Sequence, residues 1–532
     1  MTVSGLVGAA FVIALAATPL SAVIAVAILR RYRHQVAALT GQRAIERRPR
    51  AWPERRPGGG GARWIRGRPA PLEIVSRRAA RRCLAIHLLP ALVVSGGSAV
   101  VVLRTSVFVG TEPTPEFVAT LILLILAFGC PVLVVARALL IPSRRVYVGA
   151  IVALLVGVAL LGMVAVGPDN WALILLGFVA PAVVPAAVVL LSAPTALRGV
   201  GWLFTPITLA VVFAFVLMLA LIVVPQPPDG ATAGAITATA IGSVLVTSAV
   251  VAAVWWAYRT RRIDDVTEHA VVLWFSQAPW LCMWATFEGT IGDIAVGLAP
   301  FAAFVVSVPL VQVCFQRPQR DAPRHLLLLR SFAGGRRSVS LLRDVSRSWR
   351  YLGAVVLIGG VDLAGETLEP DEAVDWFLGR VGRRVITDEE DAPARVAASD
   401  LRADPDGRHR VHDILCGPEA WHATFAAIIA QVAVVLIDLR GAADSQGGLA
   451  WEVDQLATSG VTNVVVLADK STRSAWVAEL ESREPGQRGT YAPRGPVVVR
   501  PRNGAAGARQ VLHALTRVAD DADVVHPGRG SG

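Results

Sequence analysis

The stretch from residue 294 to residue 330 reads IAVGLAPFAAFVVSVPLVQVCFQRPQRDAPRHLLLLR, and the character of the chain changes within it. Before about residue 316 the chain contains long apolar runs. A bilayer core of about 30 Å needs roughly 20 such residues in a helix. After that point the apolar runs are short, as in residues 325–329, and alternate with amphipathic segments. The sequence therefore predicts an apolar N-terminal part and a C-terminal α/β part.

The composition is typical of a membrane protein. Of the 532 residues 54% are apolar, and the mean hydropathy is +0.55, which is too high for an ordinary soluble enzyme. Nine apolar runs predict membrane spans. They cover residues 3–29, 83–103, 117–140, 146–166, 171–191, 202–224, 236–257, 270–287 and 294–314. We find no carboxylate, lysine or histidine in the middle of these runs, which counts against a transporter.

The predicted fold class is an α-helical multi-pass membrane domain of about nine spans plus an α/β domain with a mostly parallel sheet. The predicted order along the chain has five parts. These are a first span (1–29), an Arg-rich cytoplasmic loop (30–82), spans two to nine (83–316), the α/β domain (321–520) and a disordered tail (521–532).

Positive charge is concentrated in the apolar part. From Asp321 onward there are 25 basic and 28 acidic residues, so the α/β part has a net charge of −3, although the whole chain carries +11. This distribution argues against a nucleic-acid partner. Arginines fall in every second predicted loop, which by the positive-inside rule predicts an outside N-terminus and a cytoplasmic α/β domain. We expect the 30–82 loop to lie on the bilayer and to contact anionic lipid headgroups.

Common cofactor and metal motifs are absent from the sequence. The cysteines have neither CxxC nor metal-ligand spacing, so no metal site is predicted; they are Cys83, Cys130, Cys282, Cys314 and Cys416. Neither GxGxxG nor GxxxxGK[ST] follows a predicted strand, which leaves a dinucleotide-binding Rossmann site or a P-loop without support. The cofactor therefore stays open.

Strand-like and helix-like segments alternate in the α/β part. Predicted strands cover residues 325–329, 354–358, 384–387, 432–437, 461–467 and 497–500. Predicted helices cover residues 339–351, 370–378, 421–431, 449–458, 472–480 and 506–518, and a long loop is expected over 388–417. Unbroken β-branched strands alternating with helices predict a parallel sheet covered on both faces.

Ligands of such sheets bind beyond the carboxyl ends of the strands. The residues at three strand ends are therefore candidate ligand-binding residues: Arg330 and Ser331, Gly359, and Asp438. Simpler interpretations stay open, because Asp commonly ends strands and Arg330 could pair with Asp438.

The segment from Trp421 to Asp469 resembles the second half of a Toll/interleukin-1 receptor (TIR) domain. A helix leads into an apolar strand and a polar loop, and the next helix carries Trp451 and Glu452 in its first turn. Arg330-Ser331-Phe332 is similar to the end of the family's first strand. The chain departs from the family where Glu452 directly follows Trp451, since the family places its Glu three residues after a Trp-Cys pair. The serine-tyrosine pair after the first strand is also replaced.

The chain has two further resemblances, the first of them in the same region. Nucleoside 2-deoxyribosyltransferases are similar in opening a helix with Gly and a catalytic Glu after a strand that ends in Asp. A group of uncharacterised bacterial membrane proteins looks similar in its Leu-Arg-Ser-Phe and Gly-Leu-x-Trp-Glu motifs. The TIR resemblance implies that Glu452 is catalytic, that Trp451 contributes to the ligand site, and that the nicotinamide–ribose bond of NAD is cleaved.

A carboxylate suits this chemistry, because cleavage of an N-glycosidic bond develops positive charge on the ribose. A glutamate in a first helical turn is also favoured by the helix dipole alone, and Trp451 could simply pack against the sheet. The function predicted is a membrane-anchored sensor or effector that binds or cleaves a nucleotide such as NAD. The alternatives are a non-enzymatic module that self-associates for signalling and a regulated transporter.

Overall fold

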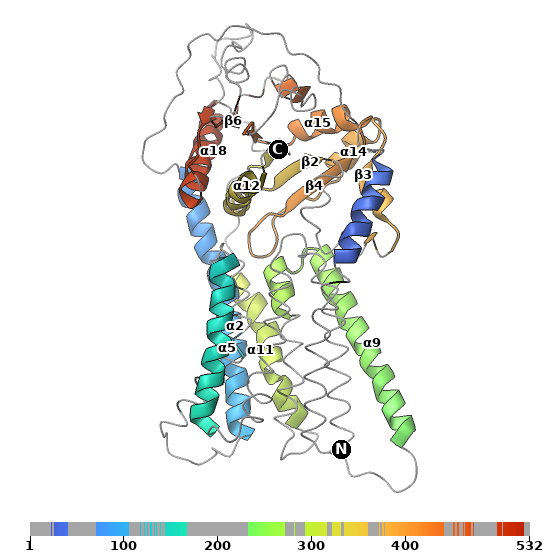
Figure 1. Ribbon diagram of the computed structural model, residues 1–532, viewed down its shortest axis with the longest axis vertical. Coiled ribbons are helices and arrows are strands. Elements are labelled where there is room, and N and C mark those ends of the chain that lie inside the picture. Colours follow the sequence, from blue (N-terminus) through green and yellow to red (C-terminus); the bar gives the residue numbers. More distant parts are fainter. Residues whose placement is uncertain are drawn as a thin grey trace. The chain divides into compact units, whose positions relative to one another are not determined.

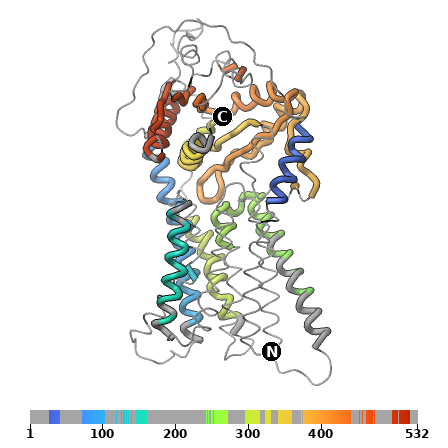
Figure 2. Tube along the Cα trace, in the orientation of Figure 1, coloured from blue at the N-terminus to red at the C-terminus, as the bar shows by residue number. Residues whose placement is uncertain are grey.

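A computed structural model of the chain is shown in Figure 1. It describes residues 26–40, 71–105, 144–166, 232–271, 293–315, 322–330, 335–359, 378–440, 463–469, 497–502 and 504–525, together with isolated residues such as Trp451 and Glu452. The coloured parts of the tube in Figure 2 follow these segments along the chain.

The chain forms two compact units, and each is described by itself. The apolar unit comprises Met1–Arg31, Arg82–Gln316 and Glu366–Leu378. The α/β unit comprises Tyr32–Arg81, Arg317–Gly365 and Gly379–Gly532.

Long helices make up the described part of the apolar unit. They are α2 (Pro71–Thr105) from Arg82 onward, α5 (Arg144–Val166), α9 (Thr232–Arg259) and α11 (Asp293–Phe315). Helices α2 and α11 touch, because a Cβ atom on Gly97 would lie 3.5 Å from the Cβ of Pro300. Ser95 on α2 also donates a hydrogen bond to the carbonyl of Phe128 at 3.0 Å.

The prediction of nine membrane spans is wrong. Among the described residues two helices are long and apolar enough to cross a membrane, Leu72–Val102 within α2 and Ala295–Phe315 within α11. Helix α5 is present where a span was predicted, but its apolar stretch is limited to Val148–Leu160. The physical reason is that hydropathy counts composition alone, and an apolar run also suits a helix packed inside a protein. The multi-pass fold class and the outside N-terminus depended on that count.

Five of the predicted spans fall wholly or mostly outside the described residues. They are residues 3–29, 117–140, 171–191, 202–224 and 270–287.

The segment 30–82 is helical at both of its described ends, where a loop was expected. Residues 26–39 are helical, and α2 begins at Pro71. Proline suits the first position of a helix, Glu73 in the first turn complements the helix dipole, and Ala and Arg follow as good helix formers. Residues 41–70 of this segment lie outside the described part of the chain.

The α/β unit contains a seven-stranded sheet in which every pairing is parallel, so the parallel-sheet prediction is confirmed. The strands are β1 (Leu326–Arg330), β2 (Val355–Gly359), β3 (Val385–Ile386), β4 (Val411–Cys416), β5 (Val434–Asp438), β6 (Val464–Leu467) and β7 (Val497–Val499). Their order across the sheet is β3-β4-β2-β1-β5-β6-β7. Strands β2 and β5 are buried over their whole length, as expected for strands covered on both faces.

Helices cover the two faces of the sheet. Alternate strand residues such as Leu327, Val356 and Val435 form one core with Val396 of α14 (Ala392–Ala397) and Phe425 of α15 (Trp421–Ile429). Helix α18 (Ala505–Val525) packs against α12 (Gly335–Trp349) and contacts β5, β6 and β7. Since α18 takes no part in the first core, it covers the other face. A short 3₁₀ turn, η6 (Val381–Arg383), precedes β3.

The predicted loop over residues 388–417 was wrong. It contains α14 and β4, and β4 pairs with β3 on one side and β2 on the other. The first half of β4 carries His412 and Asp413 and is only half-buried, so no apolar run marks it in the sequence. The predicted tail from residue 521 likewise begins inside α18, which ends at Val525.

Candidate functional site

The strand order changes direction at β1. Strand β1 pairs with β2 on one side and with β5 on the other, and β6 and β7 follow beyond β5. In open parallel sheets the crevice beyond the carboxyl ends of such a strand pair is where ligands bind. Arg330 and Asp438 end these two strands and are paired in register. The structure therefore brings two predicted site residues side by side at the switch point.

Asp438 makes an ion pair with Arg440. The Nε and Nη2 atoms of Arg440 donate to the two carboxylate oxygens, both at 2.8 Å, and the Arg440 backbone N–H donates to Oδ1 at 3.1 Å. The Asp438 side chain is 1% exposed and that of Arg440 13%, so this pair is held firmly at the sheet edge. Sequence reasoning missed Arg440 as a site residue, although its position two residues after a strand-ending Asp was the signal.

The adjoining strand ends complete this edge. Gly359 ends β2 and is paired with Leu415 of β4. Beyond β6, the Thr472 hydroxyl donates to the carbonyl of Leu439 at 3.3 Å, which ties the segments after β5 and β6 together. Ser331 lies outside the described residues.

Glu452 lies in a second group, near the end of β4. Its side chain is buried, and its carboxylate interacts electrostatically with the thiol of Cys416, the last residue of β4. Burial raises the pKa of the Cys416 thiol to about 12, a hydrogen bond with Thr424 lowers it, and the Glu452 carboxylate raises it again. The thiol therefore stays protonated and is no nucleophile.

The predicted site residues thus lie along one edge but in two groups. Glu452 is associated with Cys416 of β4, and β4 is separated from β1, the strand of Arg330, by β2. Trp451 packs on α15, because its ring stacks on His422 at 3.9 Å and meets Phe425 edge-on at 5.5 Å.

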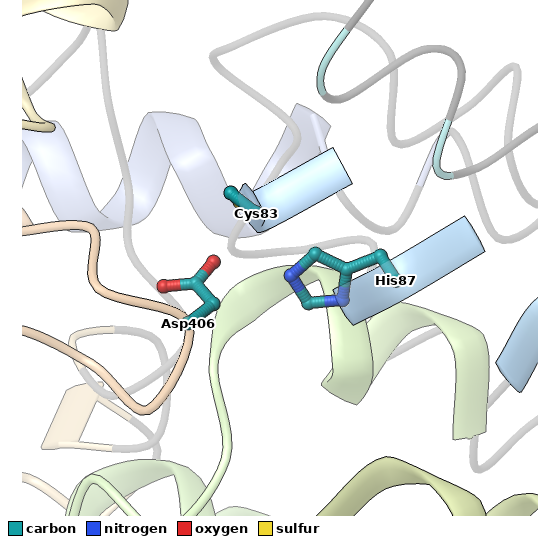
Figure 3. A group of neighbouring side chains, drawn as sticks. All are labelled: Cys83, His87 and Asp406. Atoms are coloured by element: carbon teal, nitrogen blue, oxygen red, sulfur yellow. The ribbon is translucent and has the colours of Figure 1, made fainter. Parts of the chain in front are cut away.

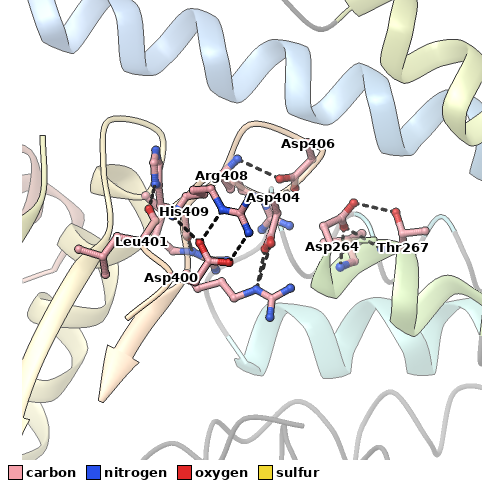
Figure 4. Close-up of polar contacts among 12 residues, drawn as sticks. Asp264, Thr267, Asp400, Leu401, Asp404, Asp406, Arg408 and His409 are labelled. Atoms are coloured by element: carbon pink, nitrogen blue, oxygen red, sulfur yellow. Dashed lines mark hydrogen bonds and ion pairs between the residues drawn. The ribbon is translucent and has the colours of Figure 1, made fainter. Parts of the chain in front are cut away.

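The amino edge of the sheet carries a buried polar network, drawn in Figure 4. Asp404 pairs with Arg410, and Asp406 pairs with Arg408. The His409 ring, which is 2% exposed, bonds through Nδ1 to the carbonyl of Leu401 at 2.8 Å. These pairs lie at the start of β4, away from the carboxyl edge, and they stabilise the hairpin that leads into it.

Two ionisable side chains lie on the apolar part of α2, one turn apart: Cys83 and His87 (Figure 3). Both are buried, and His87 Nε2 lies 3.5 Å from Asp264 Oδ1 within the same unit. His87 falls inside the predicted span 83–103, near its start rather than in its middle.

No family model, curated protein or solved structure matches this chain. The likeness to TIR domains and to deoxyribosyltransferases therefore rests on the sequence motifs given above.

Proposed function

We propose that this chain is a membrane-associated protein whose α/β unit binds a nucleotide at the carboxyl edge of its sheet and cleaves the N-glycosidic bond of a nucleotide such as NAD. One observation carries the proposal. Arg330 and Asp438 are in register across β1 and β5, where the strand order changes direction.

The charge at this edge supports a phosphate-bearing ligand. Arg330 and Arg440 place two guanidinium groups at this edge, and Asp438 lies in register with the first and pairs with the second. A guanidinium group can donate two parallel hydrogen bonds to the oxygens of one phosphate. A guanidinium that is already held in place loses little conformational entropy when the ligand binds. Asp438 orients Arg440 in this way before any ligand arrives.

Glu452 would supply the chemistry. As the bond between ribose C1′ and the pyridinium nitrogen breaks, its electron pair goes to nicotinamide, and water adds to C1′ and releases a proton. A fixed carboxylate stabilises the positive charge that develops on the ribose. The burial of Glu452 removes competing water, and the TIR resemblance of its segment favours this role.

A second candidate is nucleotide binding without cleavage. The observation that favours it is the place of Glu452 beside Cys416 of β4, on the far side of β2 from the arginine pair. A ligand would have to extend across β2 for its ribose to reach the carboxylate.

Membrane attachment would come from α2 and α11. The exposed Arg77, Arg78 and Arg81 precede the apolar part of α2, and Arg317 and Arg320 follow α11 in the sequence. By the positive-inside rule both ends would face the cytoplasm of a bacterial cell, and the α/β unit with them. The arginines of segment 30–82 would contact anionic headgroups.

The test uses the purified full chain in neutral detergent. NAD binding is measured by calorimetry and nicotinamide release by chromatography. Glu452→Gln keeps the shape and removes the charge, so release should fall about 100-fold. The exposed Glu419→Gln is the matched control and should keep the wild-type rate.

Arg330→Gln tests the ligand site that both candidates share, and nicotinamide release separates the two. If NAD binds, Arg330→Gln should weaken binding about tenfold or more, in line with the loss of one charge-assisted phosphate contact. Binding without release of nicotinamide would leave the second candidate. Absence of both binding and release would contradict the proposal.

A further inference from the structure

Helix α9 ends in a tightly bonded turn. The Arg262 N–H donates to the carbonyl of Ala257 at 2.8 Å and the Arg261 N–H to that of Tyr258 at 3.2 Å, the two bonds of a Schellman motif. The Thr260 hydroxyl donates back to the Trp256 carbonyl at 2.8 Å. These hydrogen bonds therefore hold the backbone at the end of α9 in one conformation.

An arginine occupies the position of this turn that favours glycine. Arg261 has φ 56°, and within the described residues it is the one non-glycine with positive φ. A glycine there would avoid the steric cost of a Cβ atom in the left-handed region. Arg261 is half-buried and adds a third arginine to the end of α9.

Two neighbouring arginines lie on indole rings. The guanidinium carbon of Arg262 is 4.2 Å from the centre of the Trp256 ring, and that of Arg259 is 5.4 Å from the Trp255 ring. Arg259 and Arg262 are exposed, and Trp256 is 48% exposed. The stacking orients the guanidinium groups and leaves their N–H edges for an acceptor.

The segment after the turn is fixed as well. The Asp264 carboxylate accepts hydrogen bonds from the backbone N–H groups of Val266 and Thr267, both at 2.9 Å, and from the Thr267 hydroxyl at 2.8 Å (Figure 4). Asp264, Asp265 and Glu268 are buried, with at most 5% exposure. The surface at the end of α9 is therefore cationic and aromatic.

The remainder of α9 presents apolar side chains outward. Ile241 is 55% exposed and Leu245 is 64% exposed. An exposed apolar helix that ends in Trp and Arg has the composition of the membrane–water interface, where amphipathic rings lie at the headgroup level. Charge complementarity then selects an anionic headgroup at that level.

We propose that the end of α9, from Trp255 to Arg262, binds the phosphate of an anionic phospholipid headgroup. This site is additional to the headgroup contacts proposed for segment 30–82, and it does not depend on nucleotide binding. Arg259 and Arg262 donate to the phosphate oxygens, and the two indoles lie against the glycerol region.

The test measures lipid retained by the purified full chain. The chain in neutral detergent is titrated with dioleoylphosphatidylglycerol or, in parallel, dioleoylphosphatidylcholine, and bound lipid is counted by native mass spectrometry. The double variant Arg259→Gln/Arg262→Gln should bind phosphatidylglycerol about tenfold or more weakly, with little change for phosphatidylcholine. Arg509→Gln/Arg517→Gln removes the same charge from exposed positions on α18 and should bind like the wild type.

A second variant distinguishes the loss of a lipid contact from a loss of folding. Trp256→Leu keeps every charge and should also lower phosphatidylglycerol binding several-fold, with unchanged helix content by circular dichroism. The proposal is overturned if Arg259→Gln/Arg262→Gln keeps the wild-type preference for phosphatidylglycerol. An equal loss in the α18 control would overturn it too, because net charge alone would then explain the binding.

Discussion

His325 and His409 show how two similar side chains become a pH-sensitive pair. Their ring centres are 5.9 Å apart, edge to face, at the amino edge of the sheet. Burial, followed by the charge of His409, lowers the pKa of His325 from 6.5 to about 4. The His325 Nδ1 atom accepts a hydrogen bond from the Ala354 N–H at 3.1 Å, so the neutral ring is the form that this position holds.

The stability of the α/β unit should therefore depend on pH. Because the folded pKa lies below the unfolded value, the unfolded chain takes up more protons between about pH 6.5 and 4. The contribution of neutral His325 to the stability of the folded unit is complete above about pH 6.5 and is lost as the pH falls toward 4. Urea unfolding at several pH values should show this loss in the wild type and a flatter profile in His325→Gln.

An unchanged slope in His325→Gln would mean that other groups cause the pH dependence.

Asp438 shows what the sequence reveals about a single site residue. The apolar run before it was enough to place it at a strand end, and the parallel register then set it beside Arg330. Its ion pair with Arg440 was not predictable from the strand pattern. The partner depends on the turn that brings the Arg440 backbone and side chain onto the same carboxylate.

At the scale of elements, β1, β2 and β5 were predictable and β4 was not. The first three are continuous apolar runs, because both faces of the sheet are covered there. Strand β4 begins with Val411-His412-Asp413, half-buried, and its sequence has neither an apolar run nor a regular alternation. Its position in the sheet depends on backbone hydrogen bonds to β3 and β2, which the local sequence does not reveal.

Gly353, just before β2, should tolerate no side chain. A Cβ atom there would lie 1.9 Å from the Arg324 carbonyl oxygen and 2.2 Å from its carbon. The Arg324 N–H also donates to the carbonyl of Leu352 at 2.9 Å, so neither segment can withdraw without losing bonds. Gly353→Ala should destabilise the α/β unit by about 2–4 kcal/mol, measured by urea unfolding.

Gly382 in η6 is the matched control, since a Cβ atom there would meet nothing within 4 Å. Gly382→Ala should change stability by less than about 0.5 kcal/mol. Equal effects of the two substitutions would show that the close approach at Gly353 is not what limits stability.

At the scale of the whole molecule, the division of the chain near residue 316 was visible in the sequence, but the span count was not. Apolar runs identify residues that avoid water, and they do not say whether lipid or protein surrounds them. Helix α2 is an example. Its residues before Arg82 belong to the α/β unit, and its residues from Arg82 onward belong to the apolar unit. A hydropathy profile contains no signal for that change of surroundings.

The proposed function depends on a nucleotide that binds at the carboxyl edge of the sheet. Hydrogen–deuterium exchange of the full chain with and without NAD tests it most directly. Peptides covering residues 326–331, 436–441 and 449–456 should gain protection, and the amino-edge peptide 402–412 should exchange unchanged. Equal exchange in all four peptides at saturating NAD, or protection confined to 402–412, would contradict the claim.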